Sequence, residues 1–336
     1  MSKKKMFMIL LAVIVLIALS IALGNNIKNN KTTQNTKTIF YSVNKNASVK
    51  YLAEDLKKKG IIKSKLNFEA YSLMLNLTGN IKNSRIMIEA EMAMPELIKK
   101  LKSDKPDFAV ITIPEGFRLQ QIAERLEKNK LAQKDTFMSL SLDDINGRQL
   151  IPKRKDVIFD LEGFLFPDTY FIPLTFKEKD IAELMFNRFK EAFSQQYVER
   201  AQELGISMDQ VIAIASLIER EAANDLEKST IAGVIYNRIK KDMLLQIDAA
   251  VIYANTKGEG HLTKVLYSHL KFDSKYNNYM YKGLPPGPIA SPGLKSIEAA
   301  LYPEHHDYLF YVAGEAGHVF SKTYEEHVIN VKKHIK

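Results

Sequence analysis

Two glutamates follow directly after an apolar stretch of the chain, and they are the residues best suited to acid–base chemistry. Val211 to Ile218 is almost entirely apolar, and Glu219, Arg220 and Glu221 follow it directly. A carboxyl group at the edge of apolar surroundings tends to stay protonated, because burial disfavours its charged form. A carboxyl group that is protonated near neutral pH is what general acid catalysis requires. The sequence therefore predicts a general acid here, with Glu219 as the candidate.

The element that carries these glutamates is predicted to be a buried helix. Ser207, with Gln210 three residues later, has the pattern of a capping box, so we expect the helix to begin there. Glu219 lies one turn above Ala215, whereas Glu221 lies about 200° around the helix from Glu219 by the 3.6-residue period. The residues therefore predict one buried carboxylate and not a paired dyad. The alternative is a structural glutamate paired with a neighbouring arginine at a helix end.

Residues of the types that hold sugar rings follow this helix. Amide and carboxylate groups alternate with apolar residues in Leu244 to Asp248, and Tyr276 to Tyr279 supplies aromatic rings and amides. Gly283 to Gly293 holds four prolines and three glycines, so it should form a rigid loop. A preformed loop loses little conformational entropy when a ligand binds. These segments predict an extended polar groove, with candidate substrate-binding residues Glu221, Asn237, Arg238, Gln246, Asp248, Asn277, Tyr279, Pro286 and Gly287.

The sequence gives no sign of a metal or a cofactor. The chain has no cysteine, which excludes a thiolate zinc site, a cysteine nucleophile and a disulfide scaffold. His305 and His306 are adjacent, so they lack the spacing that places two imidazoles on one helix face. His318 is a better candidate for a pocket residue, with its role open. We therefore expect neither a metal nor a cofactor.

Composition and charge restrict the class of protein. Hydrophobic residues make up 46% and charged residues 26% of the 336 residues, which fits globular domains and excludes wholesale disorder. At roughly 100–200 residues per domain, this length indicates about two domains. The net charge is +9, from 48 basic and 39 acidic residues. Such a balance favours anionic surroundings, for example a membrane surface or a polyanion.

The N-terminal residues are predicted to anchor the chain in the cell membrane. Residues 1–5 include three lysines, and Met6 to Leu23 is an uncharged run of 18 residues. A membrane span needs about 17–25 apolar residues, so we expect a single transmembrane helix over 6–24 with a cytoplasmic N-terminus. A cleaved signal peptide is the alternative. A flexible tether over 25–37 would follow, and the remainder would lie outside the cell, where the basic excess does not meet nucleic acid.

Two similar segments follow the tether at an offset of 70 residues. Each consists of a short strand (Ile39 to Val43; Val110 to Ile113), a turn and an amphipathic helix. Either such units have converged, or the chain holds a pair of small α+β modules ahead of a catalytic domain. The predicted fold class is α+β, with modules at 38–105 and 106–155 and a catalytic domain at 156–336 that includes a connecting segment, 156–205.

These segments, in this order, resemble the endolytic murein transglycosylase family (YceG-like). The resemblance extends from about Ile39 to the C-terminus. It implies a membrane-anchored protein with a LysM-like, glycan-binding module at 106–155. It also implies that Glu219, the first glutamate of the Ser-x-x-Glu-x-Glu stretch, is the catalytic acid. The motifs that carry the resemblance are Ile113-Pro-Glu-Gly116, Leu161-Glu-Gly-Phe-Leu-Phe-Pro-Asp-Thr-Tyr170, Ala215-Ser-Leu-Ile-Glu-Arg-Glu221, Asn237-Arg238, Leu245-Gln-Ile-Asp248, Tyr276-Asn-Asn-Tyr279 and Gly283-Leu-Pro-Pro-Gly-Pro-Ile-Ala-Ser-Pro-Gly293.

The sequence departs from the family pattern at two places. The family's Gly-x-Tyr element is missing near Arg85-Ile-Met-Ile88, which leaves the shape of the first module open. Ser291 stands where asparagine or threonine is common in the proline-rich loop. Neither departure touches the predicted acid.

The resemblance further implies cleavage of the MurNAc-β-1,4-GlcNAc bond in nascent peptidoglycan glycan strands. Glu219 would protonate the glycosidic oxygen and then act as base while the muramic C6 hydroxyl attacks C1, which leaves a 1,6-anhydro end. This activity would terminate or trim glycan polymerisation at the membrane, with peptidoglycan synthases (penicillin-binding proteins) as candidate partners. Two alternatives are an ordinary glycoside hydrolase that pairs Glu219 with Asp248, and a non-catalytic wall-binding or division scaffold.

Overall fold

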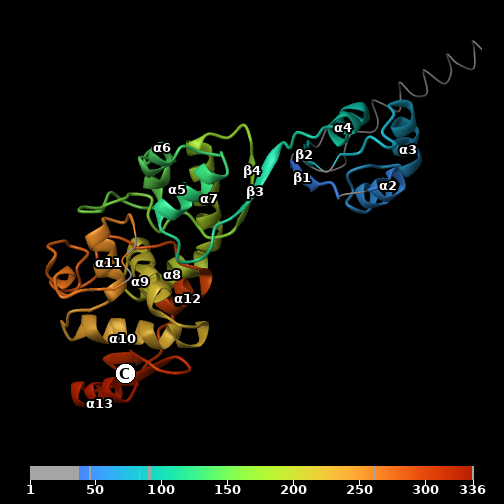
Figure 1. Ribbon diagram of the computed structural model, residues 1–336. Coiled ribbons are helices and arrows are strands. Elements are labelled where there is room, and N and C mark those ends of the chain that lie inside the picture. The colour runs from blue at the N-terminus through green and yellow to red at the C-terminus, as the bar shows by residue number, and fades with distance from the viewer. Residues whose placement is uncertain are drawn as a thin grey trace, which may run out of the picture. The chain divides into compact units, whose positions relative to one another are not determined.

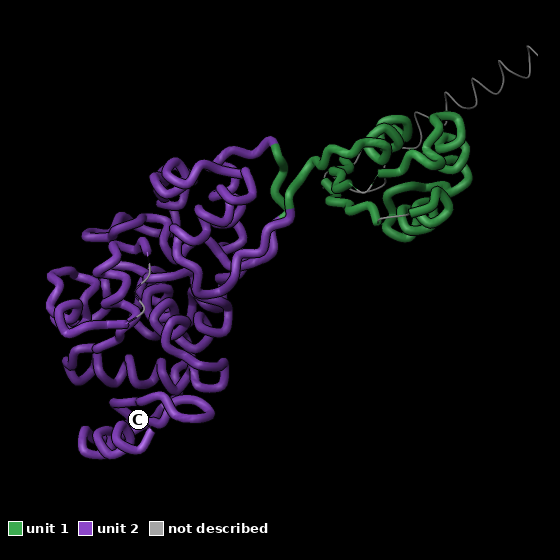
Figure 2. The backbone as a smooth tube through the Cα atoms, viewed as in Figure 1, with its two compact units in different colours: residues 1–109, 171–174 green, residues 110–170, 175–336 purple. Residues whose placement is uncertain are grey.

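The computed structural model describes residues 38–44, 47–82, 84–89, 92–260, 262 and 264–334. The predicted cytoplasmic tail, transmembrane helix and tether therefore lie outside the described residues. Within the part that is described, none of the helices is long and apolar enough to cross a membrane. The chain folds into two compact units (Figures 1 and 2).

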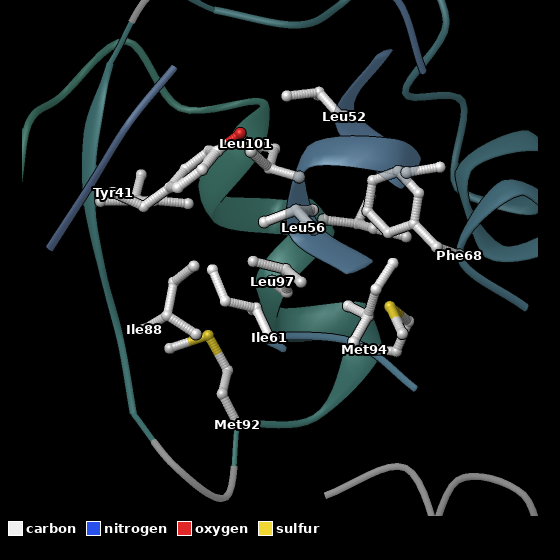
Figure 3. Close-up of a cluster of buried hydrophobic side chains, with 14 of the residues drawn as sticks. Tyr41, Leu52, Leu56, Ile61, Phe68, Ile88, Met92, Met94, Leu97 and Leu101 are labelled. Carbon is white, nitrogen blue, oxygen red and sulfur yellow. The ribbon is translucent and has the colours of Figure 1, made fainter. Parts of the chain in front are cut away.

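Unit 1 comprises residues up to 109 together with 171–174. Its strand β1 (Ile39–Ser42) pairs antiparallel with β2 (Arg85–Ile88). Its helices are α2 (Val49–Lys58), α3 (Lys65–Met74) and α4 (Met94–Leu101). These elements enclose a core of their own (Figure 3), which includes the fully buried side chains of Leu52, Leu56, Phe68 and Ile98.

Unit 2 comprises residues 110–170 and 175–336 and contains both glutamates. The predicted second strand and helix are confirmed as β3 (Phe108–Thr112) and α5 (Leu119–Lys128). Strand β3 pairs with β4 (Thr169–Pro173), and residues 108–109 and 171–173 of this pair are assigned to unit 1. The other elements of the unit are α6 (Lys134–Met138), η1 (Gly147–Gln149), α7 (Glu178–Ala192), α8 (Gln195–Glu203), α9 (Met208–Glu221), η2 (Asp225–Glu227), α10 (Lys228–Lys240), α11 (Asp248–Thr256), η3 (His269–Lys271), α12 (Leu294–Leu301), β5 (Phe310–Ala313), β6 (His318–Ser321) and α13 (Tyr324–His334).

Helix α9 is the centre of unit 2. The predicted start is confirmed, because the Ser207 N–H donates to Gln210 Oε1 at 2.9 Å and closes the capping box. All residues from Val211 to Ile218 are buried, as the apolar run predicts. Helices α8, α10, α11 and α12 pack around it (Figure 1). Its two ends are polar, with Asp209 and Gln210 at the start and the two glutamates at the C-terminal end.

The proline-rich loop packs against α9 through its backbone. Ser216 Oγ accepts a hydrogen bond from the Ile289 N–H at 3.0 Å and donates to Ala213 O at 2.7 Å. Ile289 and Ser291 are buried, so the middle of this loop belongs to the core. The bond from Ile289 to α9 and the four prolines both restrict this loop, and its rigidity stays a prediction.

The turn before α5 is fastened to the same loop. The Gly116 N–H donates to Ser291 O, and the Ser291 N–H donates to Phe117 O, both at 2.8 Å. At the start of α5, the fully buried Glu162 accepts from the Leu119 N–H at 2.9 Å and from the Tyr253 hydroxyl at 3.2 Å. The turn that carries Glu115 is thereby held against the end of α9.

Candidate active site

A pocket of about 350 Å³ lies at the C-terminal end of α9. Its walls come from α10, the start of α11, the hairpin of β5 and β6, and α13. Five of the predicted site residues line this pocket, and these are Glu221, Arg238, Gln246, Asp248 and Tyr279. His318, the candidate pocket residue of the sequence, also lines it from β6, whereas Tyr311, which follows the helix by 90 residues, was not predicted.

Glu221 is the protonatable group of this pocket. The Tyr311 hydroxyl donates to Glu221 Oε2 at 3.0 Å. Burial raises the pKa of Glu221 to about 7, and the nearby charge of Asp248 adds to the effect, whereas Tyr311 and His318 oppose it. Burial also keeps the pKa of Tyr311 well above its ordinary value, so this hydroxyl remains a donor. A carboxyl group with these surroundings can both release and accept a proton near neutral pH.

The same pocket holds a second acid–phenol pair. The Tyr279 hydroxyl donates to Asp248 Oδ1 at 2.7 Å. Gln246 and Asp248 are exposed and alternate with the buried Leu245 and Ile247, as the sequence pattern predicts. The left-handed backbone of Gln246, with φ of 53°, contributes to this turn. Exposed polar groups beside an aromatic ring are suited to binding a sugar.

Arg238 positions the pocket walls. Its Nε donates to Leu309 O at 2.6 Å, and its Nη1 donates to Leu245 O at 2.7 Å. The guanidinium lies over the Phe310 ring at 5.1 Å, and burial lowers the pKa of Arg238. Because its donors bind backbone carbonyl groups, Arg238 fixes the loop of Gln246 against the hairpin.

His318 is held by a buried glutamate. Its N–H donates to Glu227 Oε2 at 2.8 Å, and its Nδ1 lies 2.9 Å from Glu227 Oε1. Although burial opposes it, these bonds lower the pKa of Glu227, so Nδ1 is the protonated ring nitrogen. The ring packs edge-on against Tyr311 at 5.1 Å. His318 therefore supports the residue that binds Glu221, and Nε2 makes no hydrogen bond within the described part of the chain.

Glu219 lies in different surroundings from Glu221, as the helical period predicts. Its Oε2 accepts from Ser296 Oγ at 2.6 Å and from the Gly293 N–H at 3.1 Å, and Lys228 Nζ is 3.6 Å away. The expectation of an apolar environment for Glu219 is wrong, because these donors come from segments far along the chain. The alternative, in which Glu219 pairs with a neighbouring arginine, does not hold either, since its basic partner is Lys228.

Glu115 stands beside this ion pair, and sequence reasoning missed it. A Cβ added to Gly293 would lie 2.0 Å from the Glu115 carboxyl carbon, so the two residues are in direct contact. Burial and the charge of Glu219 raise the pKa of Glu115. The Ile-Pro-Glu-Gly motif was the available signal, but a glutamate in a turn is more often a local cap. Only the pairing of that turn with the proline-rich loop brings it to α9.

Four predicted site residues lie away from the pocket of Glu221. Asn237 and Pro286 line a separate hollow of about 770 Å³. Asn237 Nδ2 donates to His306 O at 2.7 Å, which makes it a backbone support. Asn277 is fully buried and donates to Leu270 O and Phe272 O. Gly287 is buried where an added Cβ would approach Arg154 Nη1 to 2.9 Å, so it permits close packing. Among the residues that the structure describes, no cluster of three or more candidate ligands could hold a metal.

The fold and the site thus define a mixed α+β protein with two carboxyl groups, those of Glu221 and Asp248, in one polar pocket. The chain belongs to the YceG-like family, whose sequence model matches residues 41–333. It is 34% identical over 323 residues to the endolytic murein transglycosylase of Bacillus subtilis (strain 168), covering 92% of this chain and 86% of that relative.

Two further relatives agree with this assignment. The endolytic murein transglycosylase of Streptococcus pneumoniae serotype 2 (strain D39) is 29% identical over 328 residues, which is 89% of this chain but only 59% of the relative. The crystal structure of a YceG-like protein from Listeria monocytogenes superposes with a TM-score of 0.62 at 31% identity. The superposition covers 87% of this chain and 98% of that one.

Proposed function

We propose that this protein is an endolytic peptidoglycan lytic transglycosylase whose catalytic acid is Glu221. The names of the relatives from Bacillus and Streptococcus support the reaction class. The observation that carries the residue assignment is the raised pKa of Glu221, about 7, inside a pocket that also holds Gln246 and Asp248. Glu219 was the sequence candidate, but its Oε2 is bound by a lysine, a serine and a backbone donor.

The proposed reaction uses one carboxyl group twice. Protonated Glu221 donates its proton to the oxygen of the MurNAc-β-1,4-GlcNAc bond as that bond breaks through an oxocarbenium-like state. The Glu221 carboxylate, stabilised by the Tyr311 hydroxyl, then takes the proton of the muramic C6 hydroxyl as that oxygen attacks C1. The product is a 1,6-anhydro end and a new free end on the other fragment. Intramolecular attack needs no second carboxylate to activate water.

In this proposal the other predicted residues orient the sugar. Gln246, Asp248 and Tyr279 present an amide, a carboxylate and a phenol on the pocket wall that faces solvent. Glu219 would be a positioning residue, because it binds the N-terminal end of α12 through Gly293 and Ser296. The end of α9 is thereby held in place while Glu221 reacts.

The acid assignment is tested with two matched substitutions on the same helix turn. We expect Glu221→Gln to lower the cleavage rate on purified glycan strands by at least about a hundredfold, as loss of a general acid does. Glu219→Gln keeps an oxygen acceptor, so we expect a smaller loss together with a lower melting temperature. If Glu219→Gln abolishes cleavage in a stably folded protein while Glu221→Gln retains it, the original sequence prediction is right and our assignment is wrong.

A hydrolase is the second candidate, since Asp248 shares the pocket with Glu221 and not with Glu219. Two carboxylates flanking a glycosidic bond can activate water. Mass spectrometry of the products separates the two reactions, because transglycosylation leaves 1,6-anhydro ends and hydrolysis leaves reducing ends. Glycan binding without either product would instead support a wall-binding scaffold.

The setting of the reaction is part of the same proposal. The lysines and the apolar run at the N-terminus support a single-pass cell-membrane anchor with the catalytic unit outside the cell. Residues 106–155 would act as a LysM-like glycan-binding module, and peptidoglycan synthases would supply nascent strands. Alkaline phosphatase fused after residue 37 would be active only if that side is extracytoplasmic.

A further inference from the structure

Helix α3 of unit 1 has two apolar faces, and the residues that the structure describes cover only one of them. Phe68 and Tyr71 point into the core of the unit. On the other side Leu66 is 77% exposed, Leu73 is 78% exposed and Met74 is 63% exposed, with exposed Ala70 between them. The four residues stand at i, i+4, i+7 and i+8, so they form one continuous stripe on the helix. We call this stripe the α3 face.

An exposed apolar stripe of this kind is unusual on a protein surface. Single exposed apolar side chains are common, but a contiguous set on one helix face generally marks an interaction site. The core of unit 1 is complete without it, because the buried cluster uses the opposite side of α3. The α3 face therefore needs a partner from outside the unit.

Basic side chains stand at both ends of the α3 face. Lys63 and Lys65 lie at its start, and Lys102 donates to Leu75 O at its end. The charge of the whole chain is also distributed unevenly. Residues 38–109 contain 13 basic and 8 acidic residues, whereas residues 110–336 contain 29 basic and 31 acidic residues. The partner of unit 1 should therefore be apolar in its interior and anionic at its surface.

We propose that the α3 face docks on the anionic lipid surface of the membrane. An interfacial helix of this type buries its apolar side chains among the acyl chains while lysines remain at the headgroups. Each lysine near an anionic surface adds to the attraction. The uncharged run Met6 to Leu23 precedes unit 1 by a tether of 13 residues, 25–37, which spans at most about 45 Å. That length keeps the α3 face within reach of any bilayer that holds the run.

The absence of cysteine makes this proposal directly testable on the full chain. A single Ala70→Cys substitution places a nitroxide spin label at the centre of the α3 face, and Glu203→Cys places one on an exposed position of α8 as control. Both proteins are reconstituted in vesicles of phosphatidylcholine alone or with phosphatidylglycerol. The measurement is the accessibility of the label to oxygen, which concentrates in lipid, and to a water-soluble nickel complex.

We expect a several-fold rise in the ratio of oxygen to nickel accessibility at position 70 when phosphatidylglycerol is present. The label at position 203 should stay accessible to nickel in both lipids. Replacing Leu66, Leu73 and Met74 by glutamine should return the label at position 70 to water, and circular dichroism should show unchanged helix content because these side chains are exposed.

Two results would overturn the proposal. One is a label at position 70 that remains in water in vesicles with phosphatidylglycerol. The other is a label that is shielded equally in detergent solution without vesicles, which would make the α3 face a contact with protein or with a second copy of the chain. Since unit 1 does not contain the pocket of Glu221, neither result depends on the proposed catalytic activity.

Discussion

At the scale of single residues, two glutamates on one helix turn serve different purposes. The 3.6-residue period alone predicts that Glu219 and Glu221 diverge, and the structure confirms it. Which of them meets the pocket could not be predicted, because the deciding partners are distant in sequence. Lys228 and Ser296 occupy Glu219, whereas Tyr311 binds Glu221. Local apolar character was therefore a poor guide to which carboxyl group faces the pocket.

The pH dependence of cleavage should report on Glu221. A general acid must be protonated, and the pKa of Glu221 is raised to about 7. We expect kcat/KM to fall as the pH rises through about 7, with the loss of the proton from this one group. Rates measured on isolated glycan strands between pH 5 and 9 test this expectation.

Tyr311→Phe provides the control for this assignment. The Tyr311 hydroxyl stabilises the charged form of Glu221, so its removal should raise the pKa of Glu221 further. The fall of kcat/KM with rising pH should then occur at a higher pH. The rate at low pH should also decrease, because the carboxylate formed in the transition state loses a donor. If kcat/KM falls at an unchanged pH in a folded Tyr311→Phe protein, the fall belongs to another group.

At the scale of elements, the sequence predicts what is local. The capping box, the apolar run and the i, i+3, i+4 spacing predict α9, α2 and α5 at their observed places. The hairpin of β5 and β6 and the pairing of the Glu115 turn with the proline-rich loop depend on tertiary contacts. Such contacts leave no periodic signal, so the second wall of the pocket and the neighbour of Glu219 went unpredicted.

Glu162 shows how one buried side chain holds an element in place. It accepts from the first N–H of α5 and from Tyr253, and burial raises its pKa to about 7. We expect Glu162→Ala to lower the free energy of unfolding by about 1–3 kcal/mol, because the Leu119 N–H would be left buried without an acceptor. Urea unfolding followed by circular dichroism measures the change.

The matched control is Glu124→Ala, on the exposed side of the same helix, where Glu124 forms a salt bridge with Lys134 at 3.0 Å. Its loss should cost no more than about 1 kcal/mol. Equal stabilities of the two variants would mean that Glu162 does not hold α5.

At the scale of the whole molecule, the chain has two separately packed units. Length alone indicates about two domains, and the apolar periodicities place cores in both halves. Residues 171–174 belong to unit 1 although the residues on both sides of them belong to unit 2. This could not be predicted, since nothing in their sequence distinguishes them from the rest of β4. The predicted boundary within unit 2, at 155 and 156, remains a prediction.

Separate cores predict separate responses to mutation. Leu56 is fully buried in unit 1, so Leu56→Ala should destabilise that unit by about 2–5 kcal/mol. Hydrogen exchange measured by mass spectrometry should accelerate in α2, α3 and α4 and remain unchanged in α9. Leu66→Ala on the exposed side of α3 should alter neither region. Faster exchange in α9 with Leu56→Ala would show that the units share one cooperative core.

The origin of the pocket wall has a consequence for the order in which the protein becomes active. Tyr311, which binds Glu221, and His318, which supports it, lie on the hairpin that follows all the other walls except α13 along the chain. Synthesis runs from the N-terminus, so α9 is made well before its partners exist. A nascent or prematurely terminated polypeptide that ends after α12 would carry both glutamates and still lack the hydroxyl that tunes one of them.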